Sequence, residues 1–493
     1  ECDRAADRAA AALASLGLVP GARIAILAPN LLEYPIVHFA AARAGLILAH
    51  FSTRATAADL ARLIDLSGAE ALVFWGELGE IVAAGRALAR TGSLRHLIAL
   101  GPSDMAGAIA FEAFLDRGLD RGLDRARGAL TAPALAPDHP LAMGFTGGTT
   151  GQPKGVLVSH RARYATAVTV AVEFGLDERD VALVVTPLFH AAGMFVWFQP
   201  AIMLGCTCVL QRRWDVDEFM TLVGRHLASA SLLVPTQLGD LSRHPDFSAA
   251  RLGSLRHIHY AGAPMPLALY DRLAASLPDV AFTENYGQTE TGPMTVRRPF
   301  HPHDKRGSVG RPAHNVELRV VGPDGAELAR GALGEIVTRG EHVMSEYWGD
   351  PEETRARFRL GDGWLWTGDL GVHDADGFFT LVDRATDMII SGAENIYPAE
   401  IENALFRHEA VAECAVFGVP DERWGEAPAA HVVLRPGLSA SAEDLIDFLG
   451  RTLARYKRPR LIKFVEHLPK TAVGKIQKNV LREPYWRGRD RRI

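Results

Sequence analysis

The chain has 493 residues, a net charge of −5, 48% hydrophobic residues and 23% charged residues. This ordinary globular composition excludes intrinsic disorder, collagen and coiled coil for most of the chain, and the length allows two or three domains with cores of their own. The negative charge argues against a nucleic-acid partner, and four cysteines are too few for a disulfide scaffold, so we expect a reducing, cytoplasmic setting.

Helical and strand patterns alternate through the first part of the chain. Alanine-rich residues 7–17 predict a helix that stops at Gly17, and residues 31–44 predict a second helix. Short apolar runs predict strands at 23–28, 71–74 and 96–100. Strands that alternate with helices are typical of βαβ units, so the sequence predicts a mostly parallel sheet, and the middle third repeats the pattern.

A long run without Asp, Glu, Lys or Arg extends from Val181 to Leu210. A membrane-spanning helix needs about 20 mostly apolar residues. Pro187, His190 and Pro200 interrupt this run, so it favours a buried strand–loop–helix segment over a membrane span.

The pattern changes after about residue 305, where a β-rich module is predicted from strands at 316–321, 334–338 and 378–382. The last hundred residues return to mixed α/β. They predict a helix after Pro398, strands near 414–419 and 429–434, and a helix over 442–455. We place a domain boundary near residues 384–387.

The C-terminal segment is strongly basic. Residues 451–493 hold 14 Lys or Arg and three Asp or Glu, a net charge of +11, so the preceding 450 residues carry −16. Such a segment attracts polyphosphates, anionic lipid or RNA, and a solvated surface rich in arginine explains it equally well.

The strongest local motif is Phe145-Thr-Gly-Gly-Thr-Thr-Gly-Gln-Pro-Lys-Gly155, between two apolar runs. Glycines let backbone N–H groups approach phosphate oxygens, threonine hydroxyls add donors, and Lys154 adds a positive charge. The motif is not a Walker A loop, because Gln-Pro follows Gly151. It predicts a phosphate-binding loop.

Four further motifs are weak when each is taken alone. Asn285-Tyr-Gly-Gln-Thr-Glu-Thr-Gly292 offers an aromatic ring for a base and a carboxylate for Mg²⁺. Trp364-Leu-Trp-Thr-Gly-Asp-Leu-Gly371 offers a carboxylate that accepts hydrogen bonds from a ribose diol. The others are Asp383-Arg-Ala-Thr-Asp-Met-Ile-Ile-Ser-Gly-Ala-Glu-Asn-Ile-Tyr-Pro398 and Pro469-Lys-Thr-Ala-Val-Gly-Lys-Ile-Gln-Lys478, where a lysine after small residues reaches an anion.

Taken together and in this order, the five motifs resemble the signature set of the adenylate-forming superfamily of acyl-CoA synthetases, nonribosomal peptide synthetase adenylation domains and luciferases. The likeness covers about residues 5–485 and is closest to fatty-acyl-CoA synthetases. It implies an α/β fold with two domains. Residues 1–385 form a large N-terminal domain of two β-sheet subdomains flanked by helices, with a small distorted β-barrel at 305–385, and residues 386–493 form a small mobile α+β domain. It also implies that relatives carry a further segment ahead of Glu1.

The resemblance implies an AMP-forming acid–CoA ligase that uses ATP, Mg²⁺ and coenzyme A. Glu290 would hold Mg²⁺, Lys475 would bridge the substrate carboxylate and the α-phosphate, and His190 would act as a gate beside the carboxylate. By the same likeness, ATP and AMP are bound by Thr146, Gly147, Gly148, Thr149, Thr150, Gly151, Lys154, Gly262, Ala263, Pro264, Asn285, Tyr286, Gly287, Gln288, Thr289, Asp369 and Arg384.

After adenylation the small domain of such enzymes rotates. The likeness assigns the hinge to Thr386 and the CoA tunnel to Ser391, Gly392 and Ala393. The sequence departs from many relatives at Thr386, where Asp or Lys is common, at Gly147, where Ser is common, and at Ala393, where Gly is common. The first departure puts the hinge position in doubt.

The acyl pocket is expected at Phe189, His190, Met194, Phe195 and Val234. Its apolar lining fits an aliphatic or aryl chain, and a medium- or long-chain fatty acid is the expected substrate. Amino-acid-activating relatives place an aspartate in this segment and a dicarboxylate would need an arginine, and residues 186–200 contain neither.

Other interpretations stay open at this point. They are an aryl or cyclic acid–CoA ligase, an acyl-AMP ligase that loads an acyl carrier protein, a luciferase-like oxygenase, and a lipid- or RNA-binding protein that uses the basic tail. Peripheral contact with an anionic membrane also stays open. The pairs Cys206–Cys208 and His301–His303 have a spacing that suits metal ligands, but no second pair accompanies them.

Overall fold

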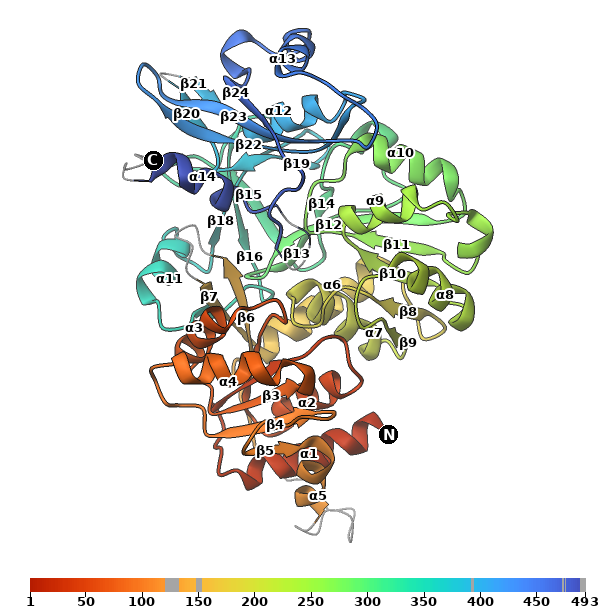
Figure 1. Cartoon of the computed structure of the whole chain (residues 1–493), viewed down its shortest axis with the longest axis vertical. Helices are drawn as coiled ribbons and strands as arrows, with labels where there is room; N and C mark the ends of the chain where they lie inside the picture. Colours follow the sequence, from red (N-terminus) through yellow and green to blue (C-terminus); the bar gives the residue numbers. More distant parts are fainter. Residues whose placement is uncertain (120–132, 148–152, 392–393, 472–473, 475, 488–493) are drawn as a thin grey trace.

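The computed structural model describes residues 1–119, 133–147, 153–391, 394–471, 474 and 476–487 (Figure 1). Strands in this part of the chain form four sheets. Two large sheets with helices lie at the bottom and centre of Figure 1, a smaller sheet lies beside them, and the C-terminal sheet lies at the top.

The first sheet has the strand order β17-β7-β6-β2-β1-β3-β4-β5 and is parallel from β6 to β5. Its strands are β1 (Arg23–Leu27), β2 (Ile47–His50), β3 (Ala71–Trp75), β4 (His96–Leu100), β5 (Ala108–Ala110), β6 (Pro140–Gly147), β7 (Pro153–Ser159) and β17 (Glu346–Tyr347). Its helices are α1 (Cys2–Ser15), α2 (Glu33–Arg43), α3 (Ala57–Ser67), α4 (Gly79–Leu88) and α5 (Phe111–Leu119), with the 3₁₀ turn η1 (Gly76–Leu78). The predicted parallel sheet is confirmed.

The second sheet has the order β14-β13-β12-β11-β10-β8-β9 and is parallel from β12 to β9. Its strands are β8 (Val181–Val184), β9 (Thr207–Leu210), β10 (Ala230–Leu233), β11 (His257–Tyr260), β12 (Ala281–Gln288), β13 (Gly292–Arg297) and β14 (Arg311–Pro312). Its helical segments are α6 (His160–Phe174), the π-helix η2 (Ala192–Phe198), α7 (Gln199–Met203), α8 (Val216–His226), α9 (Pro235–Arg243), η3 (Ala249–Leu252), α10 (Leu267–Ser276) and η4 (His303–Lys305).

The third sheet is antiparallel, with the order β15-β16-β18-β19. Its strands are β15 (Glu317–Val321), β16 (Gly334–Arg339), β18 (Leu365–His373) and β19 (Phe379–Arg384), and helix α11 (Pro351–Arg357) lies between β17 and β18 in the chain. A bridge between Gly310 and Phe379 extends its β19 edge. This sheet is the β-rich module predicted after residue 305.

The fourth sheet has the order β21-β20-β23-β22, with β24 on β23. Its strands are β20 (Ile389–Ser391), β21 (Glu394–Ile396), β22 (Val411–Asp421), β23 (Gly425–Leu434) and β24 (Leu461–Phe464). Its helices are α12 (Pro398–Leu405), α13 (Ala442–Gly450), the turn η5 (Arg455–Lys457) and α14 (Lys478–Trp486).

The helix predicted over 442–455 is shorter than expected. Ser441 caps its start by accepting a hydrogen bond from the Asp444 amide, and α13 ends at Gly450. The Arg458 guanidinium donates to the main-chain oxygens of Gly450 and Leu453, and it thereby replaces the partners that another helical turn would supply. The sequence missed this stop because it depends on a side chain eight residues further on.

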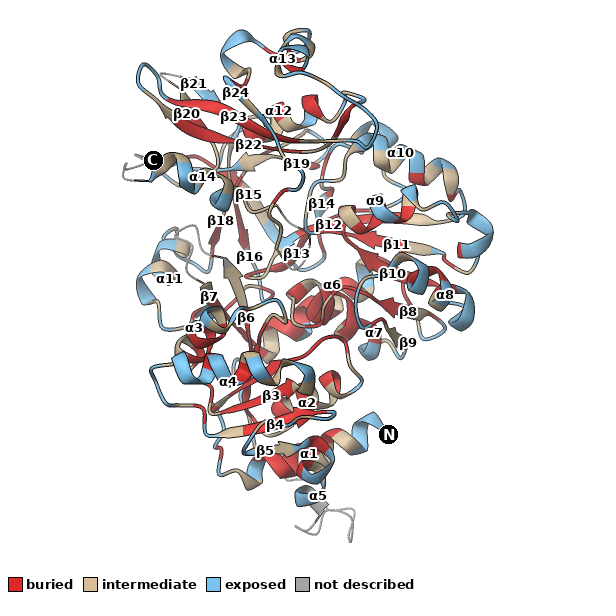
Figure 2. Cartoon of the chain, in the orientation of Figure 1, coloured by how far each residue is buried: buried red, intermediate tan, exposed pale blue. Residues whose placement is uncertain are grey.

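The first two sheets share one large core that includes residues of the helix between them, α6. Figure 2 shows α6 largely buried at the centre of the molecule. The charge-free run from 181 to 210 forms β8, η2, α7 and β9; η2 is buried apart from its first residue, as predicted, whereas Ile202 and Met203 of α7 are exposed and β9 is only partly buried. In the described part of the chain, no helix is both long enough and apolar enough to cross a membrane.

Candidate active site

The predicted phosphate loop joins the two strands of the β6–β7 hairpin. Thr146 and Gly147 end β6, and Thr146 lies opposite Lys154 of β7. Lys154 forms an ion pair with Glu353 at an Nζ–Oε1 distance of 2.7 Å, and its ammonium lies 5.3 Å from the centre of the Tyr347 ring. The remaining predicted loop residues lie outside the described part of the chain, namely Gly148, Thr149, Thr150 and Gly151.

Glu290 lies between β12 and β13 and belongs to the same cluster as Lys154. The Tyr347 hydroxyl donates to Glu290 Oε1 at 2.8 Å, and the Met344 amide donates to the Glu290 main-chain oxygen at 2.7 Å. Burial raises the pKa of Tyr347, which keeps the phenol protonated and able to donate. A carboxylate has further lone pairs besides those used by Tyr347, so Glu290 fits a divalent cation bound beside a phosphate.

The sequence prediction missed Tyr347 and Glu353. Asp350 marks a helix start, because its side chain accepts a hydrogen bond from the Glu353 amide and Pro351 follows it. That signal predicts α11 but says nothing about Lys154, which contacts Glu353 only because β17 pairs with β7 at the sheet edge.

Asp369 is the centre of a second cluster drawn from three strands. The Tyr286 hydroxyl donates to Asp369 Oδ2 at 2.7 Å, and Gln288 Nε2 donates to the same oxygen at 2.6 Å. Arg384 Nε lies 3.2 Å from Asp369 Oδ1, and the adjacent carboxylate raises the pKa of Arg384. Burial raises the pKa of Tyr286 as well. Four residues predicted separately for the nucleotide are therefore in direct contact.

The predicted adenine frame lies at the carboxyl ends of β11 and β12, which are parallel neighbours. Such ends form the ligand crevice of open α/β sheets. The Asn285 amide donates to the Tyr260 main-chain oxygen at 3.4 Å, and residues 262–264 (Gly262, Ala263 and Pro264) follow β11. A Cβ on Gly287 would lie 1.9 Å from the Gly292 oxygen, so this bulge accepts only glycine. The turn continues through Thr289, whose methyl group lies against Gly144.

The predicted acyl segment leads into a π-helix, a rare conformation that occurs often at functional sites. His190 starts the turn, because its main-chain oxygen accepts from the Met194 amide at 3.1 Å. Phe189 and His190 are half-buried, whereas Met194, Phe195 and Val234 are buried.

Asn30, which the sequence prediction missed, holds this segment in place from the other sheet. It follows β1, and its side-chain oxygen accepts from the Leu188 amide at 2.8 Å. Its side-chain nitrogen donates to the main-chain oxygens of Gln211 at 3.1 Å, Thr186 at 3.3 Å and Val184 at 3.4 Å. One buried amide therefore connects β1 with the chain that leads to His190.

The C-terminal domain contacts the large domain beside this acyl segment. Arg54 Nη1 donates to the Thr471 main-chain oxygen at 3.3 Å. A Cβ on Gly474 would lie 2.6 Å from Thr236 Oγ1, so Gly474 packs against the start of α9, next to Val234. Lys475, Gly392 and Ala393 lie outside the described residues. Ser391 ends β20, and the Thr386 main-chain oxygen accepts from Arg482 at 3.4 Å.

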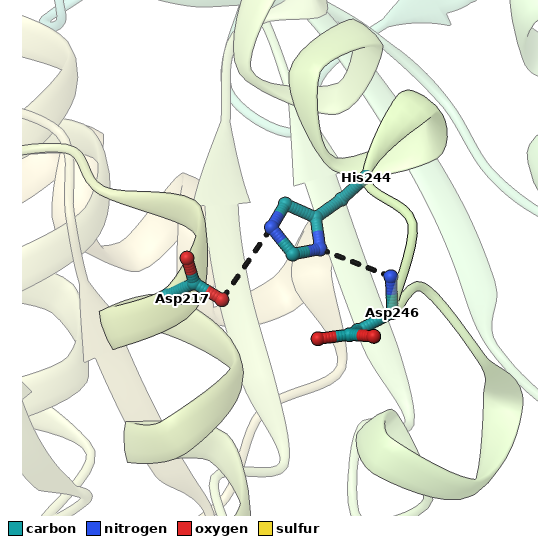
Figure 3. A group of neighbouring side chains, drawn as sticks. All are labelled: Asp217, His244 and Asp246. Carbon is teal, nitrogen blue, oxygen red and sulfur yellow. Dashed lines mark hydrogen bonds and ion pairs between the residues drawn. The ribbon is translucent and has the colours of Figure 1, made fainter.

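A separate group of side chains has the composition of a metal site (Figure 3). His244 Nε2 lies 3.4 Å from Asp217 Oδ1, and His244 Nδ1 accepts from the Asp246 amide at 3.2 Å. Both imidazole nitrogens therefore have protein partners and both carboxylates are exposed, so we assign no ion to this group.

The β6–β7 hairpin carries the predicted phosphate loop and lies beside Glu290. A second carboxylate, Asp369, contacts Tyr286 near the carboxyl end of a parallel strand. This arrangement is typical of a nucleotide-dependent α/β enzyme. Residues 1–348 match the family of AMP-binding enzymes, and residues 400–475 match the C-terminal domain of AMP-binding enzymes. The chain belongs to this family of adenylate-forming enzymes.

Most of the similar proteins are named as CoA ligases for different acids, and a relative from Streptomyces coeruleorubidus, 35% identical over 99% of this chain and 92% of its own length, is named as a fatty acid–acyl-carrier-protein ligase. A feruloyl-CoA synthase from Amycolatopsis is 36% identical over 98% of this chain and 93% of its own length. A long-chain-fatty-acid–CoA ligase from Mycobacterium tuberculosis is 33% identical over 97% of this chain and 91% of its own length. The ATP-bound structure of MatB from Rhodopseudomonas palustris has a TM-score of 0.87 and 29% identity, and it covers 98% of this chain and 93% of that chain.

These likenesses confirm the predicted superfamily, the two-domain α/β class and the enzyme class, an AMP-forming acid–thiol ligase. The co-substrates of that class, a small carboxylic acid, ATP with Mg²⁺ and CoA, are confirmed with it. The identity of the acid is not fixed by the relatives, because they name both an aryl and a fatty acid.

Proposed function

We propose that this enzyme converts a medium- or long-chain fatty acid to its CoA thioester in two half-reactions. In the first, a carboxylate oxygen attacks the α-phosphorus of ATP and pyrophosphate leaves, so that acyl-AMP forms. In the second, the CoA thiolate attacks the acyl carbonyl carbon and AMP leaves. Because adenylyl transfer depends on positioning and charge neutralisation, the observation that carries the adenylation step of the proposal is the direct contact of Tyr286, Asp369 and Arg384, three residues predicted to bind ATP.

In this proposal the two clusters bind opposite ends of ATP. Asp369 exchanges its bonds from Tyr286 and Gln288 for bonds from the ribose hydroxyls, and Arg384 remains near the α-phosphate. Thr146, Lys154 and the glycine-rich turn bind the outer phosphates. Glu290 would hold Mg²⁺, and the ion would supply positive charge beside the outer phosphates.

Lys475 is proposed to stabilise the charge that develops between the carboxylate and the α-phosphate. The contacts of Thr471 with Arg54 and of Gly474 with Thr236 support this role, because they hold the residues just before Lys475 against the large domain, the second of them next to Val234. His190, at the entrance of the π-helix, is proposed as the gate beside the carboxylate.

We propose that residues 1–385 and 386–493 move as two domains. The third sheet ends with β19 at Arg384 and the fourth begins with β20 at Ile389, so only a short connection, which contains Thr386, has to turn. Rotation would bring Ser391, Gly392 and Ala393 to the acyl-AMP, where they would line the path of the CoA thiol.

The buried side chains of Met194, Phe195 and Val234 support an aliphatic chain as the acyl group. The feruloyl-CoA synthase relative favours an aryl acid as a second candidate. An acyl carrier protein in place of CoA is the alternative acceptor.

The test measures pyrophosphate and AMP release from MgATP with aliphatic, aryl and cyclic acids. Each acid is assayed with CoA, with an acyl carrier protein carrying its phosphopantetheine arm, and with neither. CoA-dependent AMP release with fatty acids supports the proposal. AMP release with aryl acids only would replace the fatty acid in the proposal with an aryl acid. AMP release that depends on the carrier protein would replace CoA with the carrier protein as the acceptor. No release with any acid contradicts it.

A further inference from the structure

The side chains around Phe195 form an unusual environment for an apolar pocket residue. Phe195 is 3% exposed and lies in the π-helix, one turn beyond His190. The Arg163 guanidinium lies 5.1 Å from the centre of its ring. The imidazoles of His50 and His38 lie 5.5 Å and 6.1 Å from it. A cation and two imidazoles therefore surround a residue predicted to line the acyl pocket.

Arg163 is a fully buried cation that forms no ion pair with an acidic residue in the described part of the chain. It lies in the first turn of α6 and is 1% exposed. Its Nη2 donates to the His342 main-chain oxygen at 3.1 Å, whereas Nε and Nη1 have no hydrogen-bond partner among the described residues. Burial lowers the pKa of Arg163 to about 10, so the group stays charged at neutral pH. Buried charges in proteins are normally paired, because an unpaired one costs several kcal/mol.

The neighbouring imidazoles do not supply the missing negative charge. Tyr34 forms a hydrogen bond of 2.8 Å with His50 Nδ1, and His50 Nε2 and His38 Nδ1 have no partner among the described residues. Burial lowers the pKa of His38 to about 4 and lowers that of His50 as well, so both rings are neutral near pH 7. Neutral imidazoles add hydrogen-bonding nitrogens to the guanidinium without neutralising it.

Several independent segments build this cluster. His38 comes from α2, His50 from the end of β2, Arg163 from α6 and Phe195 from η2. Figure 2 shows α6 buried at the centre of the molecule, between the two large sheets. Because the polar groups lie on a strand and two helices that pack in the core, their position is fixed by the core and not by a surface loop.

We propose that Arg163, with His38 and His50, forms a polar subsite at the inner end of the acyl pocket, which binds an oxygen acceptor at the far end of the acid substrate. The acceptor is a ketone or a second carboxylate. This inference rests on the proposed function and narrows its substrate class. The substrate is an acid that carries a carbonyl or carboxylate oxygen at the end opposite the reacting carboxylate. The arginine that a dicarboxylate needs is absent from residues 186–200 and is supplied by α6.

The test compares linear acids of 6 to 12 carbons in three matched forms: the plain alkanoate, the oxo acid with a ketone next to the terminal methyl, and the dioate. The kcat/KM for CoA-dependent AMP release is measured for each. We expect one oxygenated form to exceed the plain acid of equal length by about 10²-fold, because a buried donor left unpaired penalises the wrong substrate. Preference for the oxo acid identifies a neutral acceptor, and preference for the dioate an anionic one.

Arg163→Met tests the residue itself, since methionine keeps an unbranched chain of similar reach without the charge. It should remove the preference by lowering kcat/KM for the oxygenated acid while leaving or raising that for the alkanoate. Arg161→Met is the matched control on the same helix, because Arg161 is bonded to Asp138 and Glu341 at the surface. This control should keep the wild-type preference.

Two results overturn the inference. The first is a wild-type enzyme that favours the plain alkanoate at every chain length. This result needs no variant, so it can be obtained even if Arg163→Met does not fold. The other is an equal loss for all three acid forms in a folded Arg163→Met enzyme, which indicates a structural role. Absence of AMP release with every acid contradicts the proposed function instead, so the two failures are distinguishable.

Discussion

The two ends of the candidate site differ in how their charged groups are satisfied. At the nucleotide end, the Asp369 carboxylate has Tyr286, Gln288 and Arg384 as partners. At the acyl end, two nitrogens of Arg163 have no partner among the described residues. A ligand at the first end has to exchange existing bonds, whereas a ligand at the second end gains new ones. The first therefore favours a preformed site for a common ligand, and the second favours selection of a particular acid.

The largest effect on activity is expected for Lys475, which is proposed to act between the nucleotide and the acid. Lys475→Ala should lower acyl-AMP formation by about 10³-fold, because a donor to developing charge is lost. Thioester formation from supplied acyl-AMP should remain largely intact, since the proposed function assigns this residue to the first half-reaction only. Pyrophosphate release and thioester formation are measured separately.

Lys463→Ala is the control for this variant, because Lys463 lies exposed on β24. It should leave both half-reactions unchanged. Equal loss of both half-reactions in Lys475→Ala would contradict the role assigned to this lysine.

The nucleotide end is tested by Asp369→Asn. An amide in place of the carboxylate removes the ion pair with Arg384 and leaves one acceptor oxygen where the carboxylate has two, so the NH₂ group faces either Arg384 or the donors of Tyr286 and Gln288. We expect kcat/KM for ATP to fall by about 10²-fold. The preference among acids should not change. Asp376→Asn, at an exposed position beside Lys305, should have no effect on ATP. If Asp369→Asn changed the preference among acids and left the kinetics with ATP intact, Asp369 would belong to the acyl end and not to the nucleotide end.

The acyl end is tested by Asn30→Ala, which removes the contacts to Leu188, Thr186 and Gln211. We expect kcat/KM for the acid to fall by about tenfold with an unchanged KM for ATP, because the segment before His190 loses its support. The free energy of unfolding should fall by about 1–3 kcal/mol, since buried backbone groups lose their partner. Leu32→Ala, at a neighbouring exposed position, is the control for both measurements. A loss of stability without any change in acid kinetics would make Asn30 a structural residue only.

The smallest effect concerns the connection between the domains. Burial raises the pKa of Asp383 from its usual 3.8 to about 6. The folded protein therefore binds the proton more tightly than the unfolded chain, and the stability gained from protonation is lost as pH rises from about 4 to about 6. The loss is about 1–3 kcal/mol.

Asp383→Asn should remove this pH dependence, because an amide does not ionise. Unfolding by denaturant, measured at pH values across that range, checks the expectation. Asp447→Asn, at an exposed position of α13, should retain the wild-type slope. An unchanged slope in Asp383→Asn would show that other groups cause it.

Local motifs predicted three residues that the structure brings into direct contact. Tyr286, Asp369 and Arg384 lie in three segments that carry weak signals separately, and their order along the chain made the prediction strong. Tyr347, Glu353 and Asn30 were missed. Their partners are far away in the sequence: Lys154 contacts Glu353 across sheet pairing, and Asn30 contacts a loop of the other sheet. No local pattern records such a contact.

The sequence by itself determined the fold class through strand and helix periodicity, and it determined the family and the reaction type through the resemblance of five local motifs to a known superfamily, because both kinds of signal are local properties of the chain. Only the tertiary structure decided which side chains surround Phe195, a residue predicted to line the acyl pocket. Arg163 lies in a helix that the sequence analysis did not connect with the acyl pocket, yet packing of α6 between two sheets brings its charge against Phe195. Under the inference drawn from Arg163, substrate choice depends on such long-range packing. Whether a buried charge is paired can be read only from the three-dimensional contacts.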